Sequence, residues 1–111
     1  MTEEKIQKVL KVFCEQLKKL YGETLSGIIL YGSCARGDFS EESDIDILVL
    51  LSVAPEKIGN ERNKALDLTA DLDMTYDVVL APVFQSEEIY RKYMPVSVFY
   101  QNVEREGVRV A

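Results

Sequence analysis

Residues 31–51 read YGSCARGDFSEESDIDILVLL, and this stretch decides the fold. It begins where a short apolar run, Leu25–Tyr31, ends at Gly32, and it closes with a second apolar run over residues 44–51. Both runs are shorter than an ordinary helix and rich in Ile, Leu and Val, which is typical of buried strands. The polar segment between them, residues 32–43, is rich in turn-forming residues. The sequence therefore predicts two strands joined by a polar loop.

The rest of the chain alternates between helical and extended patterns. Residues 3–21 place apolar side chains at every third or fourth position, which predicts an amphipathic helix. The same spacing predicts a helix over residues 55–72, and an apolar run predicts a third strand over residues 76–82. The remaining expected elements are two helices, 86–93 and 95–106, and a short strand, 108–110. Alternation of this kind indicates an α/β fold, in which helices pack against a sheet.

Composition excludes several classes of function. The chain has 111 residues, the length of one domain, so we expect residues 1–111 to form a single domain. Thirteen Lys and Arg stand against nineteen Asp and Glu, which argues against direct nucleic-acid binding. No apolar run has the length of a membrane span and the N-terminus lacks a signal-peptide core, so the cytoplasm is the expected compartment. The absence of histidine excludes nucleophiles activated by imidazole.

Gly32 and Ser33 predict a phosphate-binding turn after the first strand. Glycine allows a sharp turn and a close approach of the backbone to a ligand. A short helix that begins at Ser33 would direct its free amides at a phosphate, and the Ser33 hydroxyl would add another donor. The segment is not a P-loop, because the Gly-x-x-x-x-Gly-Lys pattern is absent.

Asp44 and Asp46 predict a metal site at the start of the second strand. Alternate residues of a strand face the same side, about 6.6 Å apart, and two carboxylates there repel each other unless a cation lies between them. Hard oxygen ligands suit Mg²⁺, which completes its shell with water and substrate phosphates. Asp77 is the first candidate for a third carboxylate, because its strand is expected beside that of Asp44, and Asp73 is the alternative. The other interpretation of the Asp-x-Asp pattern is a solvated strand face.

The same residues resemble a known family. The Gly32-Ser33 pair, a ten-residue gap and the Asp44-x-Asp46 pattern are similar to the signature of nucleotidyltransferases of the DNA polymerase beta superfamily. The segments ARG (35–37) and SDID (43–46), and the tail FYQNVEREGVRV (99–110), resemble the minimal nucleotidyltransferases, a small prokaryotic branch. The resemblance implies the nucleotidyltransferase fold, a mixed β-sheet with helices packed against it.

The resemblance also implies roles for particular residues. Three carboxylates would bind two Mg²⁺ ions and act as the catalytic residues: Asp44, Asp46 and Asp77. Of these, Asp77 would help to deprotonate the attacking hydroxyl. Gly32 and Ser33 would hold the β- and γ-phosphates of ATP, and Arg36 would neutralise part of the triphosphate charge.

The acceptor of the nucleotide is expected on a second protein, because the chain ends soon after the catalytic core whereas larger relatives append an acceptor-binding domain. The resemblance implies a HEPN-type helical partner, the toxin of a toxin–antitoxin module, and transfer of AMP to a tyrosine of that toxin. The chain would then be a protein adenylyltransferase that acts as a type VII-like antitoxin. Two alternatives stay open: a non-catalytic module that masks the HEPN partner, and a small-molecule nucleotidyltransferase completed by homo-oligomerisation.

Overall fold

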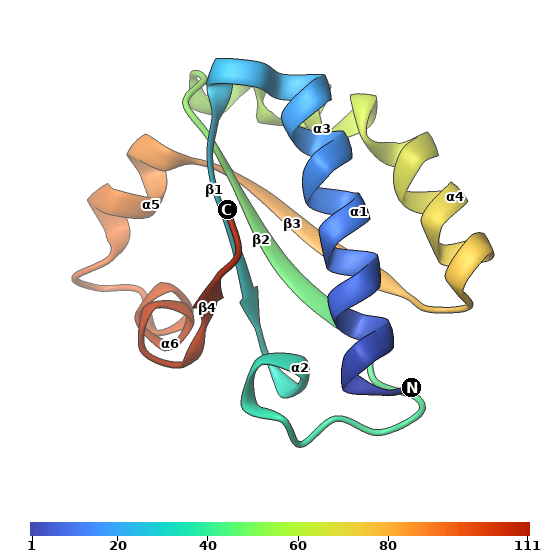
Figure 1. Cartoon of the computed structure of the whole chain (residues 1–111). Helices are drawn as coiled ribbons and strands as arrows, with labels where there is room; N and C mark the ends of the chain where they lie inside the picture. The colour runs from blue at the N-terminus through green and yellow to red at the C-terminus, as the bar shows by residue number, and fades with distance from the viewer.

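The computed structural model describes residues 1–111 and places a four-stranded sheet between two pairs of helices (Figure 1). The α/β architecture predicted from the alternating pattern is therefore confirmed. No helix has the length and apolar character needed to cross a membrane. The helices and strands are, in chain order, α1 (Glu3–Tyr21), β1 (Leu25–Tyr31), α2 (Ser33–Arg36), β2 (Ile45–Leu51), α3 (Ile58–Lys64), α4 (Leu66–Tyr76), β3 (Leu80–Ser86), α5 (Glu87–Tyr93), α6 (Val98–Glu106) and β4 (Val108–Arg109), with 3₁₀ turns at Gly22–Thr24 and Pro55–Lys57.

The sheet is mixed, with strand order β3-β2-β1-β4. Strand β1 is antiparallel to both β2 and β4, whereas β3 runs parallel to β2. The register sets Asp46 of β2 beside Tyr31 on one neighbouring strand and beside Ala81 on the other. Because paired residues of adjacent strands project to the same face, these three side chains share one side of the sheet.

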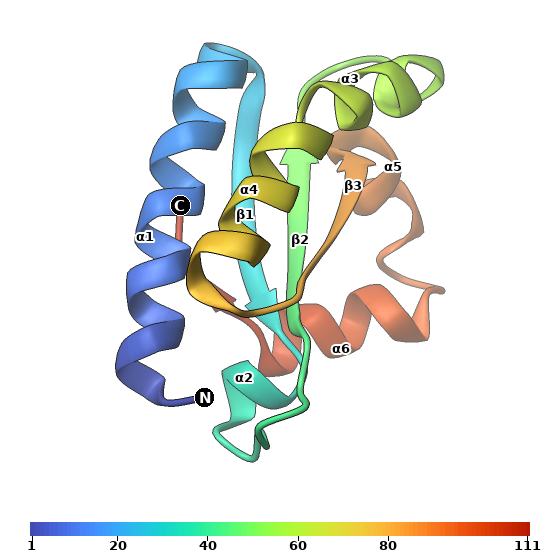
Figure 2. The same ribbon diagram turned by 90° about the vertical axis from the view of Figure 1, so that its right-hand side faces the viewer.

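Helices cover both faces of the sheet, so β2 is buried on both sides. Helices α1 and α4 lie on one face and α5 and α6 on the other (Figures 1 and 2). The larger core, on the α1 side, contains nineteen buried residues, among them Phe13, Ile28, Ile45 and Ile47. The smaller core, on the α6 side, contains five buried residues: Ile29, Leu48, Leu50, Tyr90 and Val103. Burial on both faces explains why residues 45–51 form a continuous apolar run rather than an alternating one.

Helix α1 has the bounds that the sequence predicts. The Thr2 hydroxyl accepts a hydrogen bond from the Lys5 amide at 3.1 Å, which satisfies one of the free donors at the start of the helix. The helix ends at Gly22, whose φ of 56° favours glycine. Its apolar stripe packs on the sheet, with Phe13 and Leu17 fully buried.

Three predicted elements differ from the structure. The helix predicted over residues 95–106 is α6, which begins only at Val98 because Ser97 caps its first turn. The third strand, predicted over residues 76–82, is β3 at Leu80–Ser86, because α4 continues to Tyr76 and the connecting turn takes up the first part of the apolar run. Pro82 lies inside β3, which is possible because β3 is an edge strand with one unpaired side. The single helix predicted over residues 55–72 is divided at Ala65 into α3 and α4.

Candidate active site

The turn after β1 brings its backbone against the start of β2. Gly32 has φ 73° and ψ −156°, a region that is essentially restricted to glycine. A Cβ atom at Gly32 would collide with the Asp46 carboxylate. The Gly32 carbonyl accepts a hydrogen bond from the Arg36 amide at 3.1 Å, which closes the single turn of α2. The first amides of α2, at Ser33 and Cys34, have no carbonyl partner within the helix and are available to an anion.

The carboxylates of Asp44 and Asp46 lie beside this turn and have no protein partner. Neither side chain takes part in an ion pair or accepts a hydrogen bond from the protein. Burial raises the pKa of Asp46, the negative charge of Asp44 raises it further, and Arg36 acts in the opposite direction. The structure therefore contains two close, like-charged oxygen donors at the start of β2.

Cys34 connects α2 to the segment that carries these carboxylates through a hydrogen bond. Its thiol donates a hydrogen bond to the Asp44 carbonyl at 3.6 Å, and its side chain is buried in the larger core. Burial also raises the pKa of the Cys34 thiol. Cys34 and Cys14 are both free, so this contact is non-covalent. Cys34 is therefore a small packing residue of the core.

Arg36 is held at the edge of the site by two acidic residues. Its guanidinium pairs with Asp38 at 3.2 Å and with Glu106, at the end of α6, at 3.6 Å. The hydrogen bond to Asp38 is the main cause of the raised pKa of Arg36. The contact with Glu106 links α2 to α6 across the end of the sheet, opposite the end where α3 lies (Figure 2). Arg36 thus provides a cation near the carboxylate pair without neutralising it.

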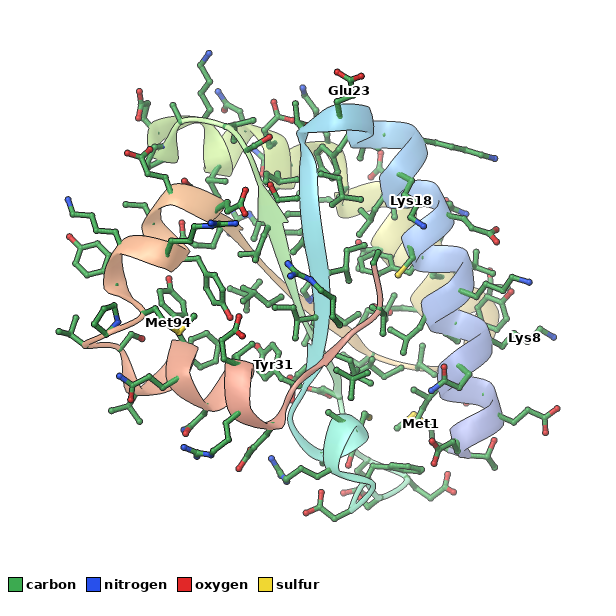
Figure 3. The ribbon with its side chains drawn as sticks, turned by 60° about the vertical axis from the view of Figure 1, so that its left-hand side comes forward. Met1, Lys8, Lys18, Glu23, Tyr31 and Met94 are labelled. Atoms are coloured by element: carbon green, nitrogen blue, oxygen red, sulfur yellow. The ribbon has the colours of Figure 1, made fainter.

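Tyr31 and Phe99 form a wall of the site that the sequence does not predict. Tyr31 is paired in register with Asp46, and its ring packs edge-on against Phe99 of α6 with 5.4 Å between centroids. Figure 3 shows the Tyr31 side chain on the α6 side of β1. Burial and then the charge of Asp46 raise the pKa of Tyr31. This wall depends on the strand register and on the packing of α6, which no local sequence signal specifies.

Asp77 lies outside the carboxylate pair in this structure. It follows the last residue of α4 in a left-handed conformation, and it is the only non-glycine residue with positive φ. Its side chain is exposed, and its carbonyl accepts a hydrogen bond from the Lys5 ammonium at 3.3 Å. The β3 residue beside Asp46 is Ala81. No group of three or more carboxylate or thiol side chains is placed to hold a metal ion.

Asp73, the alternative third ligand, has a structural partner. Its carboxylate accepts a hydrogen bond from the Leu80 amide at 2.8 Å, which connects α4 to the start of β3. The donor set at Asp44 and Asp46 fits a hard divalent cation, because neither of these two carboxylates has an ion-pair or hydrogen-bond partner in the protein. Such an ion would take its remaining ligands from water and phosphate oxygens.

Comparisons with known proteins cover nearly the whole chain. Residues 6–107 match the nucleotidyltransferase domain family. The chain is 40% identical over 101 residues, 91% of its length and 93% of the relative's, to "Putative protein adenylyltransferase MJ0604" of Methanocaldococcus jannaschii. It is 33% identical over 105 residues, 95% of its length and 98% of the relative's, to MJ0141 of the same organism, which has the same description. A crystal structure of a toxin–antitoxin with AMP-PNP aligns with a TM-score of 0.57 at 26% identity, over 100% of this chain and 73% of that one.

Proposed function

The chain belongs to the nucleotidyltransferase domain family, and on this premise we propose that it is a protein adenylyltransferase with an antitoxin role. In this proposal it transfers AMP from ATP to a tyrosine hydroxyl of a HEPN-type helical partner. The observation that carries the proposal is the unpaired Asp44–Asp46 carboxylate pair against the Gly32 turn. The descriptions of the M. jannaschii relatives support a protein acceptor, and the toxin–antitoxin with AMP-PNP supports an adenine nucleotide and a toxin partner.

The β1–α2 turn would bind the triphosphate. Gly32 lets the backbone approach the phosphates, and the Ser33 amide and hydroxyl supply donors to the β- and γ-phosphate oxygens. Arg36 would leave part of its contact with Asp38 and Glu106 to offset the phosphate charge. Those ion pairs are exposed, so exchanging them for a phosphate costs little free energy.

Asp44 and Asp46 are the residues that would hold Mg²⁺, with two ions in the loaded site. When bound, the ions stabilise negative charge on the attacking and leaving oxygens. We assign the third carboxylate to Asp77, which requires a shift of the turn at residues 77–79 when the site is loaded. This turn joins α4 to β3, and the exposed Asp77 carboxylate has no partner. The contacts that the shift affects are those of backbone carbonyls, from the Lys5 ammonium to Asp77 and from the Ile45 amide to Val79.

The transfer of AMP requires no histidine, because a carboxylate can accept the proton of the attacking hydroxyl. The tyrosine oxygen forms a bond to the α-phosphorus, the bond from that phosphorus to the bridging oxygen breaks, and pyrophosphate leaves. The hydroxyl proton passes to a site carboxylate. We assign this role to Asp77, in line with the role that the family resemblance implies for it.

The proposal is tested by incubating the chain with α-labelled ATP, Mg²⁺ and the purified product of the neighbouring gene, which the proposal expects to be a HEPN-type protein. We expect label on the partner with the wild-type chain and none with the Asp44→Asn/Asp46→Asn double variant. Asp71→Asn, an exposed position of α4, is the matched control and should keep full activity. Label on a small molecule alone would contradict a protein acceptor. Neutralisation of the toxin by the double variant would show masking rather than catalysis.

A further inference from the structure

Four of the ten exposed large hydrophobic side chains share one surface of the chain: Val83, Tyr93, Val96 and Phe99. Part of this surface is hollowed into a groove of about 370 Å³, which we call the α5–α6 groove, lined by Val83, Tyr93, Val96, Ser97, Phe99 and Tyr100. Contiguous apolar surface of this kind marks interaction sites rather than ordinary solvent-exposed protein.

The α5–α6 groove adjoins the candidate active site through one shared residue, Phe99. Phe99 lines the groove and also packs against Tyr31, 5.4 Å away between ring centroids. Tyr31 is the register partner of Asp46, and paired strand residues lie about 5 Å apart. The groove is therefore within roughly 10 Å of the Asp46 carboxylate.

Hydrogen bonds and ring packing fix the shape of the groove. The Tyr100 hydroxyl accepts a hydrogen bond from the Gln85 amide group at 2.9 Å, and the Tyr100 ring packs on Tyr90 with 4.9 Å between centroids. The Ser97 hydroxyl accepts a hydrogen bond from the Tyr100 amide at 3.1 Å and so fixes the start of α6. All of these contacts lie within the chain, so the fold itself sets the shape of the groove.

We propose that the α5–α6 groove docks the adenylyl acceptor protein through an apolar side chain. A strand spans about 3.3 Å per residue, so an extended segment anchored in the groove presents a hydroxyl residue about three positions away to Asp46. This inference rests on the proposed function, because it places the acceptor of that same reaction. The inference also predicts the specificity of the reaction: the modified hydroxyl residue has an apolar residue about three positions away in the acceptor sequence.

Charge and size favour this occupant over a second copy of the chain. No charged residue lines the groove, whereas Asp44 and Asp46 in the adjoining candidate site repel an acidic segment. The acceptor segment is therefore apolar at the anchor and neutral or basic near its hydroxyl. A specific stable interface buries about 800 Å² per partner, and a groove of six side chains supplies only part of that area. A buried anchor side chain is sufficient for a transient substrate complex.

The test is Val96→Asp, with Met74→Asp as the matched control. Both side chains are exposed, 75% for Val96 and 84% for Met74, so neither change disturbs the core, and Met74 lies on α4 across the sheet. With the adjacent HEPN-type protein as acceptor, we expect Val96→Asp to raise the KM for the acceptor at least tenfold and to leave the affinity for ATP unchanged. Met74→Asp should change neither quantity.

A second measurement separates the docking surface from the chemistry. Calorimetric titration of the same acceptor without ATP should show binding to the wild-type chain and at least tenfold weaker binding to Val96→Asp. If no label is transferred but this difference holds, the proposed function fails and the docking surface stands. Three results would overturn the docking surface: equal acceptor binding by the two proteins, weakened ATP binding by Val96→Asp, which assigns the groove to the nucleobase, or a change of oligomeric state, which assigns it to a second copy.

Discussion

Removing one charge of the carboxylate pair should stabilise the chain. Asp44 and Asp46 are two positions apart along extended backbone, about 6.6 Å. Two unit charges at that distance repel each other by about 0.6 kcal/mol in water and by about 2.5 kcal/mol at an effective dielectric constant of 20. Since Asp46 is half-buried and Asp44 is exposed, we expect Asp46→Asn to raise the free energy of unfolding by about 1 kcal/mol at pH 7 without divalent ions.

The pH dependence of the free energy of unfolding tests the same reasoning independently. The folded-state pKa of Asp46 is raised above its ordinary value of 3.8, so the ionised carboxylate destabilises the fold at neutral pH. The penalty is relieved as the pH falls through the raised pKa and is absent below 3.8, where the two proteins should become equally stable. Urea denaturation in EDTA at several pH values measures this, with Asp71→Asn as the control for loss of an exposed charge. Equal effects of Asp46→Asn and Asp71→Asn at pH 7 would refute the reasoning.

Three further substitutions probe the turn, the α4–β3 connection and the core. Gly32→Ala should destabilise the chain by about 1–3 kcal/mol in urea denaturation, because a Cβ enters a glycine-only conformation and meets the Asp46 carboxylate. Asp77→Gly should leave stability unchanged or raise it by less than about 1 kcal/mol, since glycine adopts the left-handed conformation freely, while labelled AMP transfer to the acceptor falls if Asp77 is the third ligand. Phe13→Ala should cost about 3–5 kcal/mol by the same denaturation assay, because the ring is fully buried between α1 and the sheet.

The hairpin and the first helix could be predicted from sequence because their signals are local. Apolar runs bounded by polar residues mark β1 and β2, and Thr2 caps α1 by a contact within one turn. The apolar pattern places the third strand four residues too early, because the run from Val78 spans both the connecting turn and the strand. The cap of α4 at Asp77 and the hydrogen bond from the Leu80 amide to Asp73 decide that boundary, and neither contact is visible in the pattern of apolar residues.

The candidate site could be predicted only in part, because one of its walls depends on contacts between distant segments of the chain. The Gly32 turn and the Asp44–Asp46 pair lie within fifteen residues of chain, so their spacing is sufficient to predict that they meet. The wall formed by Tyr31 and Phe99 joins segments far apart in sequence, and its formation follows from the register of β1 on β2 and from the docking of α6. Periodicity predicts that Phe99 is on a helix, but not which strand residue that helix covers.

The central claim is that Asp44 and Asp46 form a divalent-ion and nucleotide site beside the Gly32 turn. Calorimetric titration with AMP-PNP and Mg²⁺ tests it most directly, because binding is measured without turnover or an acceptor. The account predicts saturable binding by the wild-type chain that requires Mg²⁺ and is lost in the Asp44→Asn/Asp46→Asn variant. Equal binding by the two proteins, or no binding by the wild-type chain, would contradict it.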